Sequence, residues 1–381
     1  MSPSRGLVVW DERFTEYDFG DDHPFTERSR RSAVRLLETV VPQTTQFLRE
    51  VPPAGHRLLE TFHEPGYLTL VEGASVRGKA IPLDSGDTPA FLGCFDAAGR
   101  IVEGAVRAVD FSLHERAPAF HPAGGLHHAH PDRASGFCIF NDVAVAVKHA
   151  VSSGHRVAYL DIDAHHGDGV MYGFYDSGRV LDIDFHQDGR TLFPGTGRVD
   201  ETGAGDGAGL KVNLPLPPGT GDEALEPLVR RVVPPLLRSF RPELIIVQHG
   251  ADGHAGDPLT SLQYTSAAYD QVDRLVVGLA HELCQDRLVV TGGGGYRPES
   301  VARVLARAGA ASLGHSPPDL DAPLAPAWRT HFQAEWDRSA PPNWRDAFPL
   351  EPSPWGPENT DELVATLERH LGIRLPRVPA V

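Results

Sequence analysis

Short runs of apolar, β-branched residues recur along the chain, and a polar or glycine-rich segment follows each of them. The runs are nearly continuous rather than alternating, which is typical of strands in a sheet that is covered on both faces. They predict strands at residues 7–10, 156–163, 180–185, 244–248 and 288–290.

Between these strands, apolar residues repeat at helical spacing. The clearest example is residues 225–237, where apolar side chains recur three and four positions apart. Pro234 and Pro235 lie inside it and are expected to kink or break the helix. Strands that alternate with helices predict an α/β fold with a mostly parallel central sheet and helices on both faces. The other predicted helices are residues 26–41 with Thr26 as N-cap, 141–151, 266–284, and 298–311 with Pro298 in the first turn.

The composition changes near residue 316. A chain of 381 residues could hold two domains, but the spacing of the strands favours a single domain over residues 1–315. Residues 316–381 are rich in Pro, Trp and Asp. They predict an extension that packs on the domain and ends in a short helix, residues 361–371, closed by Gly372.

The charge and the cysteines narrow the classes of function. A formal net charge of -16 opposes binding to nucleic acids and to anionic membrane surfaces, so neither is expected as a partner. Cys94, Cys138 and Cys284 are an odd number without paired spacing, which argues against disulfides and cysteine zinc clusters. The sequence shows neither a signal peptide nor a membrane span, and the cytoplasm is the expected location.

The end of the second predicted strand carries three possible metal ligands. Because strand side chains alternate between faces, Asp161, Asp163 and His165 point the same way. Asp257 follows the fourth predicted strand and is the predicted third ligand beside Asp163 and His165. Two carboxylates and one imidazole suit a divalent ion with a position left for water, as in catalytic zinc sites. The alternative is a pair of hydrogen-bonded turns without a metal.

His127 and His128 are adjacent imidazoles in a glycine-rich loop. Imidazole carries protons near neutral pH, and His128 could act as both base and acid if a carboxylate orients it. Asp161 and Asp168 are the carboxylates available to hold one histidine each. The alternative is ordinary polar packing.

A run of four glycines, residues 292–295, lets the backbone approach closely and turns Tyr296 toward the predicted site. The Tyr296 hydroxyl could stabilise an oxyanion, although a flexible turn is the alternative. Phe137 and Phe193 lie on glycine-rich loops and could wall a narrow apolar slot, or belong to the core.

Together these segments resemble the histone deacetylase family of zinc amidohydrolases in the arginase/deacetylase superfamily, most closely its bacterial acetoin-utilisation branch. The resemblance extends from about residue 8 to residue 314. It rests on Gly-Gly-Leu-His-His-Ala (124–129), Ala-Ser-Gly-Phe-Cys-Ile-Phe-Asn-Asp (134–142), Asp-Ile-Asp-Ala-His-His-Gly-Asp-Gly-Val (161–170), Leu-Phe-Pro-Gly-Thr-Gly (192–197), Gly-Ala-Asp-Gly-His-Ala-Gly-Asp-Pro-Leu (250–259) and Gly-Gly-Gly-Gly-Tyr (292–296), which occur in the family's order.

The resemblance implies an arginase/deacetylase-like fold and hydrolysis of acetyl-lysine. Asp163, His165 and Asp257 would hold zinc, with ferrous iron as the alternative. The remaining catalytic roles would fall to His128 paired with Asp168 as general base and acid, His127 paired with Asp161 as an electrostatic partner, and Tyr296 as the group that polarises the acyl carbonyl.

The resemblance also implies binding sites around this centre. Gly136, Phe137 and Phe193 would line the tunnel for the acyl-lysine stem, and Asp87 would hold substrate backbone at the rim. One potassium ion would take ligands from Asp161, Asp163, His165, Asp184 and Phe185, and a second would lie near Phe174, Ser177 and Val180.

One position departs from the family pattern. An arginine that lines an internal cavity usually stands six residues after the histidine of His23-Pro24, where this chain has Ser29 between Arg28 and Arg30. Handling of released acetate is therefore open. Other readings are an acetylpolyamine or small N-acyl amide deacylase, a two-manganese ureohydrolase, whose second aspartate-rich run is absent, and a binding protein without turnover.

Overall fold

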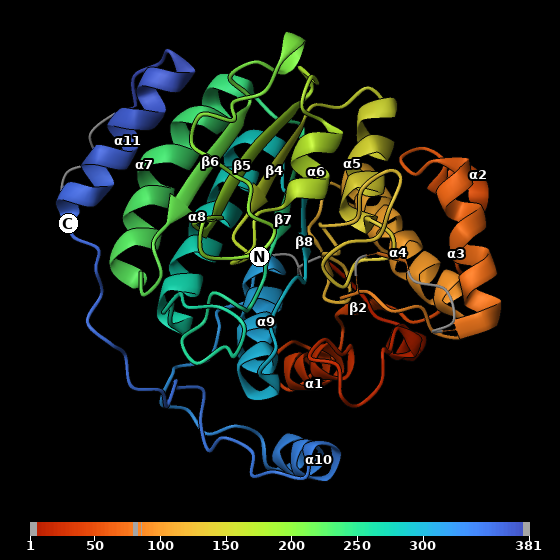
Figure 1. Cartoon of the computed structure of the whole chain (residues 1–381). Coiled ribbons are helices and arrows are strands. Elements are labelled where there is room, and N and C mark those ends of the chain that lie inside the picture. The colour runs from red at the N-terminus through yellow and green to blue at the C-terminus, as the bar shows by residue number, and fades with distance from the viewer. Residues whose placement is uncertain (1–5, 79–82, 85, 376–381) are drawn as a thin grey trace.

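A computed structural model describes residues 6–78, 83–84 and 86–375. Its core is one sheet of eight strands in the order β2-β1-β3-β8-β7-β4-β5-β6, in which every neighbouring pair is parallel (Figure 1). The predicted α/β class with a parallel sheet is confirmed. The strands are β1 (Leu7–Val9), β2 (Gln46–Leu48), β3 (Ala119–His121), β4 (Val157–Asp161), β5 (Val180–Gln187), β6 (Lys211–Leu216), β7 (Leu244–Gln248) and β8 (Leu288–Thr291).

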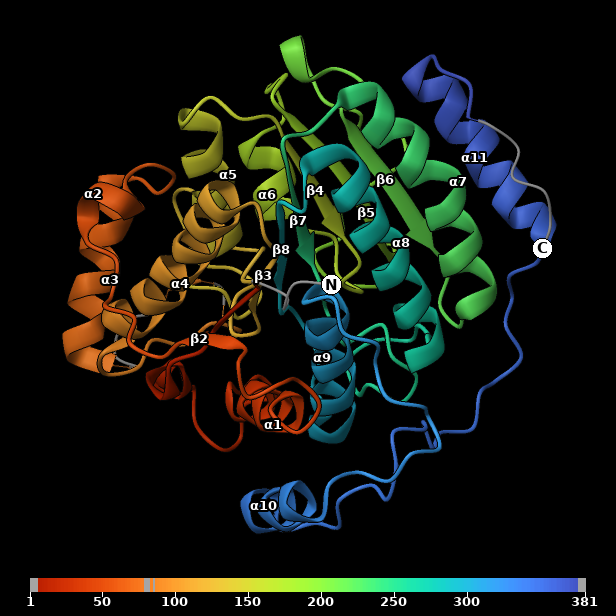
Figure 2. The same ribbon diagram turned by 180° about the vertical axis from the view of Figure 1, so that it is seen from behind.

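Helices cover both faces of this sheet. Helices α7 and α8 lie in front of the strands in Figure 2, and α5 and α6 lie toward the opposite face, as right-handed crossovers between parallel strands require. In the described ranges, no helix combines the length and the apolar character needed to cross a bilayer. The α-helices are α1 (Arg28–Leu37), α2 (His56–Leu59), α3 (Pro65–Arg77), α4 (Cys94–Glu115), α5 (Asp142–Ser152), α6 (Asp168–Gly173), α7 (Asp222–Phe240), α8 (Ser266–Cys284), α9 (Pro298–Ser312), α10 (Pro326–Trp336) and α11 (Pro357–Leu371).

The five predicted strands are all present, and their burial explains their sequence pattern. Every residue of β4, β5 and β7 is buried, because helices cover both faces of the sheet there. Strand β2 lies at one edge and is partly exposed.

The predicted helices at residues 266–284 and 298–311 correspond closely to α8 and α9, whereas two others differ in detail. Helix α7 continues through Pro234 and Pro235 without a break, because its apolar side is packed against the body of the protein. Helix α1 begins at Arg28 rather than Thr26, and the Thr26 hydroxyl instead accepts a hydrogen bond from the Arg28 N–H (3.3 Å).

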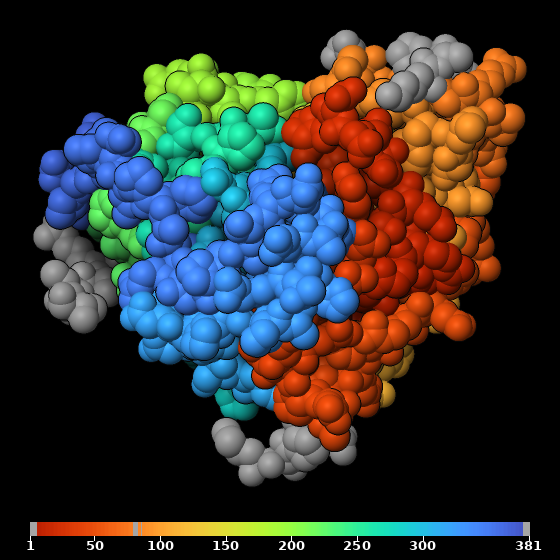
Figure 3. Space-filling view, turned by 90° about the horizontal axis from the view of Figure 1, so that it is seen from below, coloured from red at the N-terminus to blue at the C-terminus, as the bar shows by residue number. Residues whose placement is uncertain are grey.

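The segment after residue 316 lies against the rest of the protein, where Figure 3 shows it in blue beside the N-terminal region. It contains a helix that the sequence did not predict, α10, and Trp328 Nε1 of this helix donates a hydrogen bond to the Ser32 main-chain oxygen (2.8 Å). Its last helix, α11, packs on α7 and ends at Gly372, which has a left-handed backbone conformation as predicted.

Candidate active site

The candidate site lies at the carboxyl ends of β4, β7 and β8, which are neighbours in the sheet. Loops after parallel strands meet at one edge, where α/β sheets place their ligands. Main-chain hydrogen bonds join two of the loops, since Ala251 N donates to Gly294 O (2.8 Å). These loops carry the predicted residues Asp163, His165, Asp257 and Tyr296.

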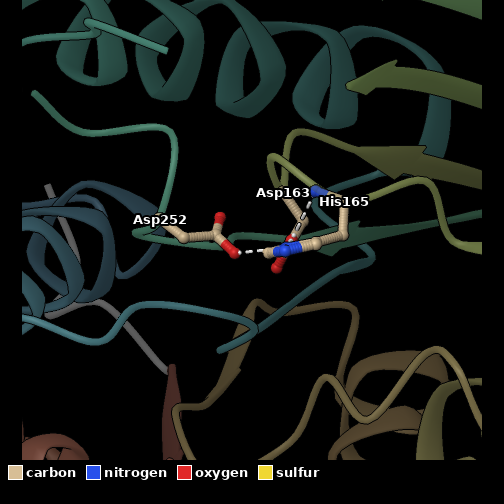
Figure 4. Close-up of side chains that lie close together, drawn as sticks. All are labelled: Asp163, His165 and Asp252. Carbon is tan, nitrogen blue, oxygen red and sulfur yellow. Dashed lines mark hydrogen bonds and ion pairs between the residues drawn. The ribbon is translucent and has the colours of Figure 1, made fainter. Parts of the chain in front are cut away.

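Three buried side chains converge at this edge: Asp163, His165 and Asp252 (Figure 4). Their possible ligand atoms all lie within 4.8 Å of one another. Asp252 Oδ2 lies 2.8 Å from His165 Nδ1, and Asp163 Oδ1 lies 3.2 Å from the same nitrogen. The sequence analysis placed Asp163 and His165 here and missed Asp252, although Asp252 follows the same strand as Asp257.

Asp257, the predicted third ligand, lies in the same loop but outside this convergent group. Its carboxylate accepts hydrogen bonds from Tyr296 N (2.9 Å) and Leu259 N (3.0 Å). Burial and the nearby charge of Asp252 raise the pKa of Asp257 to about 7. Its role as a metal ligand stays a prediction.

The chemistry of this group fits a divalent cation. Asp163 and Asp252 bring two buried carboxylates together with one imidazole, and the charge of Asp252 also raises the pKa of the buried Asp257. Like charges this close repel one another unless a cation offsets them. Carboxylate oxygens and an imidazole nitrogen are ligands for Zn²⁺ and for Fe²⁺. The residues therefore form a possible metal site.

Two histidine–aspartate pairs lie beside the cluster, as predicted. His127 Nδ1 lies 2.9 Å from Asp161 Oδ2, and His128 Nδ1 lies 2.7 Å from Asp168 Oδ1. The Nε2 atoms of the two histidines face each other at 3.1 Å. Asp168 also binds His130 Nε2 (3.0 Å), a contact that the sequence analysis did not anticipate.

The surroundings of the two histidines push their pKa values apart. Burial opposes the charge of His127, but Asp161 and Asp163 outweigh it and raise the pKa of His127 to about 9. Burial and the adjacent His127 charge lower the pKa of His128 to about 4. These values favour a protonated His127 and a neutral His128 near neutral pH, and pKa values pushed apart in this way are typical of acid–base sites.

A narrow cavity leads to these groups, lined by His128, Gly136, His165 and Tyr296 among others. Gly136 has a φ of +53°, and a Cβ atom there would lie 2.5 Å from the His128 ring, so a larger residue does not fit. The Phe193 ring lies 5.0 Å from the His128 ring, and the Phe137 ring 5.8 Å from that of Tyr296. Gly136 thus lines the cavity, and Phe193 and Phe137 lie beside two residues that line it, His128 and Tyr296.

The predicted rim residue Asp87 lies close to this wall. Its carboxylate accepts a hydrogen bond from the Thr88 hydroxyl (3.0 Å), and that hydroxyl accepts one from Phe137 N (3.0 Å). Burial and the neighbouring Asp84 raise the pKa of Asp87 to about 6. Through Thr88, the rim carboxylate is connected to the backbone of the tunnel wall.

The residues predicted for the first potassium site lie together, since Asp161 on β4 pairs in register with Asp184 on β5. Asp184 Oδ2 accepts a hydrogen bond from Gly167 N (2.8 Å). At the second predicted site the Lys211 ammonium is already present, donating to the Val180 main-chain oxygen (2.8 Å). One of the predicted carbonyl ligands of that second site therefore already accepts a hydrogen bond from a lysine.

Position 29 carries a serine, but the next residue, Arg30, is an arginine. Arg30 is buried, and its guanidinium donates to the main-chain oxygens of Gly293 and Gly295 and to the Ser29 hydroxyl. A guanidinium thus lies against the glycine run despite Ser29.

Comparisons with known proteins identify relatives of this arrangement. Residues 23–311 match the family model described as "Histone deacetylase domain". The "Acetoin utilization protein AcuC" of Bacillus subtilis strain 168 is 34% identical over 96% of each chain. A "Probable deacetylase" of Archaeoglobus fulgidus is 36% identical over 77% of this chain and 81% of its own. The solved structure "Crystal Structure of HDA15 HD domain" aligns with a TM-score of 0.73 at 28% identity, covering 81% of this chain and 90% of its own.

Proposed function

The chain belongs to the histone deacetylase family, and from this premise we propose that it is a zinc-dependent deacetylase that hydrolyses acetyl-lysine to lysine and acetate. The observation that carries the proposal is the approach of the two histidine Nε2 atoms, 3.1 Å apart, beside the buried Asp163–His165–Asp252 group. A protein that only binds acyl amides needs no such pair of proton carriers.

In the proposed mechanism, a divalent ion held by Asp163, His165 and Asp257 supplies Lewis-acid chemistry to the acyl carbonyl and the attacking water. His128 keeps Nδ1–H on Asp168, so its Nε2 is the atom that takes the proton of the water and later returns it to the leaving amine. His127, held by Asp161, carries positive charge next to this transfer.

Tyr296 is the proposed donor to the developing oxyanion. Burial and the charges of Asp252 and Asp163 raise the pKa of Tyr296 well above its usual value, so the hydroxyl keeps its proton. A fixed donor in a water-poor site stabilises charge that appears only in the transition state. Phe137 and Phe193 suit the neutral, apolar stem of acyl-lysine, because burying a charged lysine between them is costly.

A small N-acyl amide, such as an acetylated polyamine, is the second candidate substrate. The net charge of -16 would attract a cationic polyamine to the tunnel. The family match argues against a ureohydrolase. The proposed location is the cytoplasm, in keeping with three buried free thiols, Cys94, Cys138 and Cys284.

The test combines bound-metal analysis with hydrolysis of a fluorogenic acetyl-lysine peptide and of an N-acetylated polyamine. Wild-type protein, His128→Ala and the exposed-site control His281→Ala are each assayed with and without chelator. The proposal is supported if the wild-type protein binds one equivalent of zinc and loses peptide hydrolysis on chelation. Without chelator, His128→Ala should also lose hydrolysis, whereas His281→Ala should keep it. Hydrolysis of only the polyamine selects the second candidate, and bound metal without turnover of either contradicts both.

A further inference from the structure

Lys211 is a fully buried lysine at the start of β6, away from the metal cluster. Its ammonium donates to the main-chain oxygens of Val180 (2.8 Å) and Leu210 (3.4 Å). Lysine is almost never fully buried unless its charge is matched by a partner. Inside the protein, these two carbonyl oxygens are the acceptors that hold it.

One of these acceptors, the Val180 oxygen, lies at the end of the turn between α6 and β5. Ser177 N donates to Phe174 O (3.0 Å) within this turn, and β5 begins at Val180. Rings of main-chain carbonyls are ligands for potassium. The Lys211 ammonium already lies at the Val180 oxygen. A potassium ion bound to the same oxygen would therefore be repelled by the ammonium.

An acidic group lies on the neighbouring strand. Asp182 on β5 pairs in register with Lys211 on β6, and both are buried. Neither carboxylate oxygen of Asp182 has a hydrogen-bond partner among the described residues. Burial and the charge of Asp184 raise the pKa of Asp182 well above its usual range, although Lys211 opposes the change. The main-chain oxygens, rather than an ion pair with Asp182, therefore hold the Lys211 side chain.

The surroundings of Lys211 affect its ionisation. Burial lowers the pKa of Lys211 to about 8, while Asp182 and Asp176 oppose the change.

We propose that the Lys211 ammonium is a covalently attached substitute for a monovalent cation, which ties the turn at residues 174–180 to β6 and leaves no potassium site at the Val180 carbonyl. The proposal concerns the stability of the fold and does not depend on the proposed deacetylase activity. Its test therefore uses thermal unfolding and ion location rather than turnover.

The first experiment compares unfolding of the full-length protein in KCl and in choline chloride at equal ionic strength. The variants are Lys211→Ala, which opens the carbonyl site, Lys211→Arg, which keeps a cation there, and Lys148→Ala, which removes an exposed lysine. Replacing choline with potassium should raise the Tm of Lys211→Ala by on the order of 3–5 °C more than that of wild type or Lys148→Ala. Equal responses of Lys211→Ala and wild type would overturn the proposal.

A second experiment needs no variant and decides the matter if Lys211→Ala does not fold. Crystals of wild-type protein grown in RbCl are examined for anomalous scattering from rubidium, which replaces potassium. The expected result is no rubidium at the Val180 main-chain oxygen. A rubidium ion bound to that oxygen would overturn the proposal.

Discussion

Asp346 Oδ1 lies 2.7 Å from Nε2 of His254, which joins the C-terminal extension to the loop that carries Asp252 and Asp257. The same carboxylate accepts hydrogen bonds from the Ser266 N–H (2.8 Å) and hydroxyl (3.0 Å). Burial opposes its charge, but the hydrogen bond from His254 outweighs it and lowers the pKa of Asp346 to about 2.

Phe348 reinforces this connection two residues later. Its ring packs against the His254 ring at 5.8 Å, and a Cβ atom at Gly256 would lie 2.8 Å from it. Arg297 adds two further contacts. Its guanidinium lies 4.2 Å from the Phe348 ring and donates a hydrogen bond to Gly256 O (3.3 Å). The loop with the two aspartates is thus held from outside the predicted catalytic domain.

Asp346→Ala should therefore loosen the metal-binding loop. We expect the affinity for zinc to fall by roughly tenfold or more, as for other groups that orient metal ligands from behind. Competition with a chromogenic chelator measures this directly. Asp321→Ala is the matched control, because it removes the exposed ion pair with Arg345, next to Asp346, without touching the loop. An unchanged zinc affinity in folded Asp346→Ala would show that the contact is only structural.

A comparison of Asp252→Ala with Asp257→Ala will identify the third metal ligand. Asp252 is paired with His165, whereas Asp257 accepts hydrogen bonds only from main-chain N–H groups among the described residues. Asp257 thus has no side-chain hydrogen-bond partner among the described residues, and a bound metal ion would offset its charge. We expect Asp257→Ala to lose zinc almost completely and Asp252→Ala to lose about ten- to a hundredfold in affinity. Elemental analysis after dialysis reads both, and the reverse order would assign the ligand role to Asp252.

Tyr296→Phe should remove the donor to the oxyanion while leaving the metal in place. We expect kcat to fall by about 10²–10³-fold, the usual loss for one such donor. Zinc content and thermal stability should stay near wild type. Tyr172→Phe is the control, since the Tyr172 hydroxyl binds Glu201 on the surface. Equal kcat values for Tyr296→Phe and wild type would remove Tyr296 from the mechanism.

His63 should make the fold sensitive to acid. Its Nδ1 donates to His130 O (3.0 Å) and its Nε2 accepts from Asn141 N (3.0 Å), which fixes the neutral ring. Burial lowers the pKa of His63 from 6.5 to about 4, so the folded state binds fewer protons than the unfolded state in this range. Its contribution to stability is complete above pH 6.5 and is lost as the pH falls toward 4.

The expected loss is about 2 kcal/mol of unfolding free energy between about pH 6.5 and pH 5. Urea unfolding at both pH values measures it. His63→Asn should show a smaller loss over the same interval than wild type, whereas His281→Asn, at an exposed position, should match wild type. Parallel losses in wild type and His63→Asn would assign the acid sensitivity to other groups.

Five of the eight strands, and the positions of several site residues, could be predicted because their signals are local. A buried parallel strand is a continuous apolar run, and polar residues just after it fall at the sheet edge where Asp163, His165 and Tyr296 are found. Helix α4 escaped prediction. Gly104 lies inside it, although glycine is a poor helix former, because a Cβ atom there would lie 2.6 Å from the His121 ring.

The rest depends on contacts between distant parts of the chain. The bond between His254 and Asp346 joins residues 92 positions apart, and no local pattern signals it. The sequence likewise could not identify Asp252 as part of the cluster, because only the folded structure shows that its carboxylate lies beside His165. The hydrogen bond from Arg30 to Gly295 O also joins residues 265 positions apart.

The bond between Asp346 and His254 also has a consequence for biosynthesis. Ribosomes make the N-terminal parts of a chain first, and domains fold as their residues become available. The loop around His254 is made before Asp346, which lies 92 positions later in the chain. A nascent chain can thus complete its central sheet while this loop still lacks its outer support. The metal-binding loop would reach its full stability only after Asp346 has been synthesised.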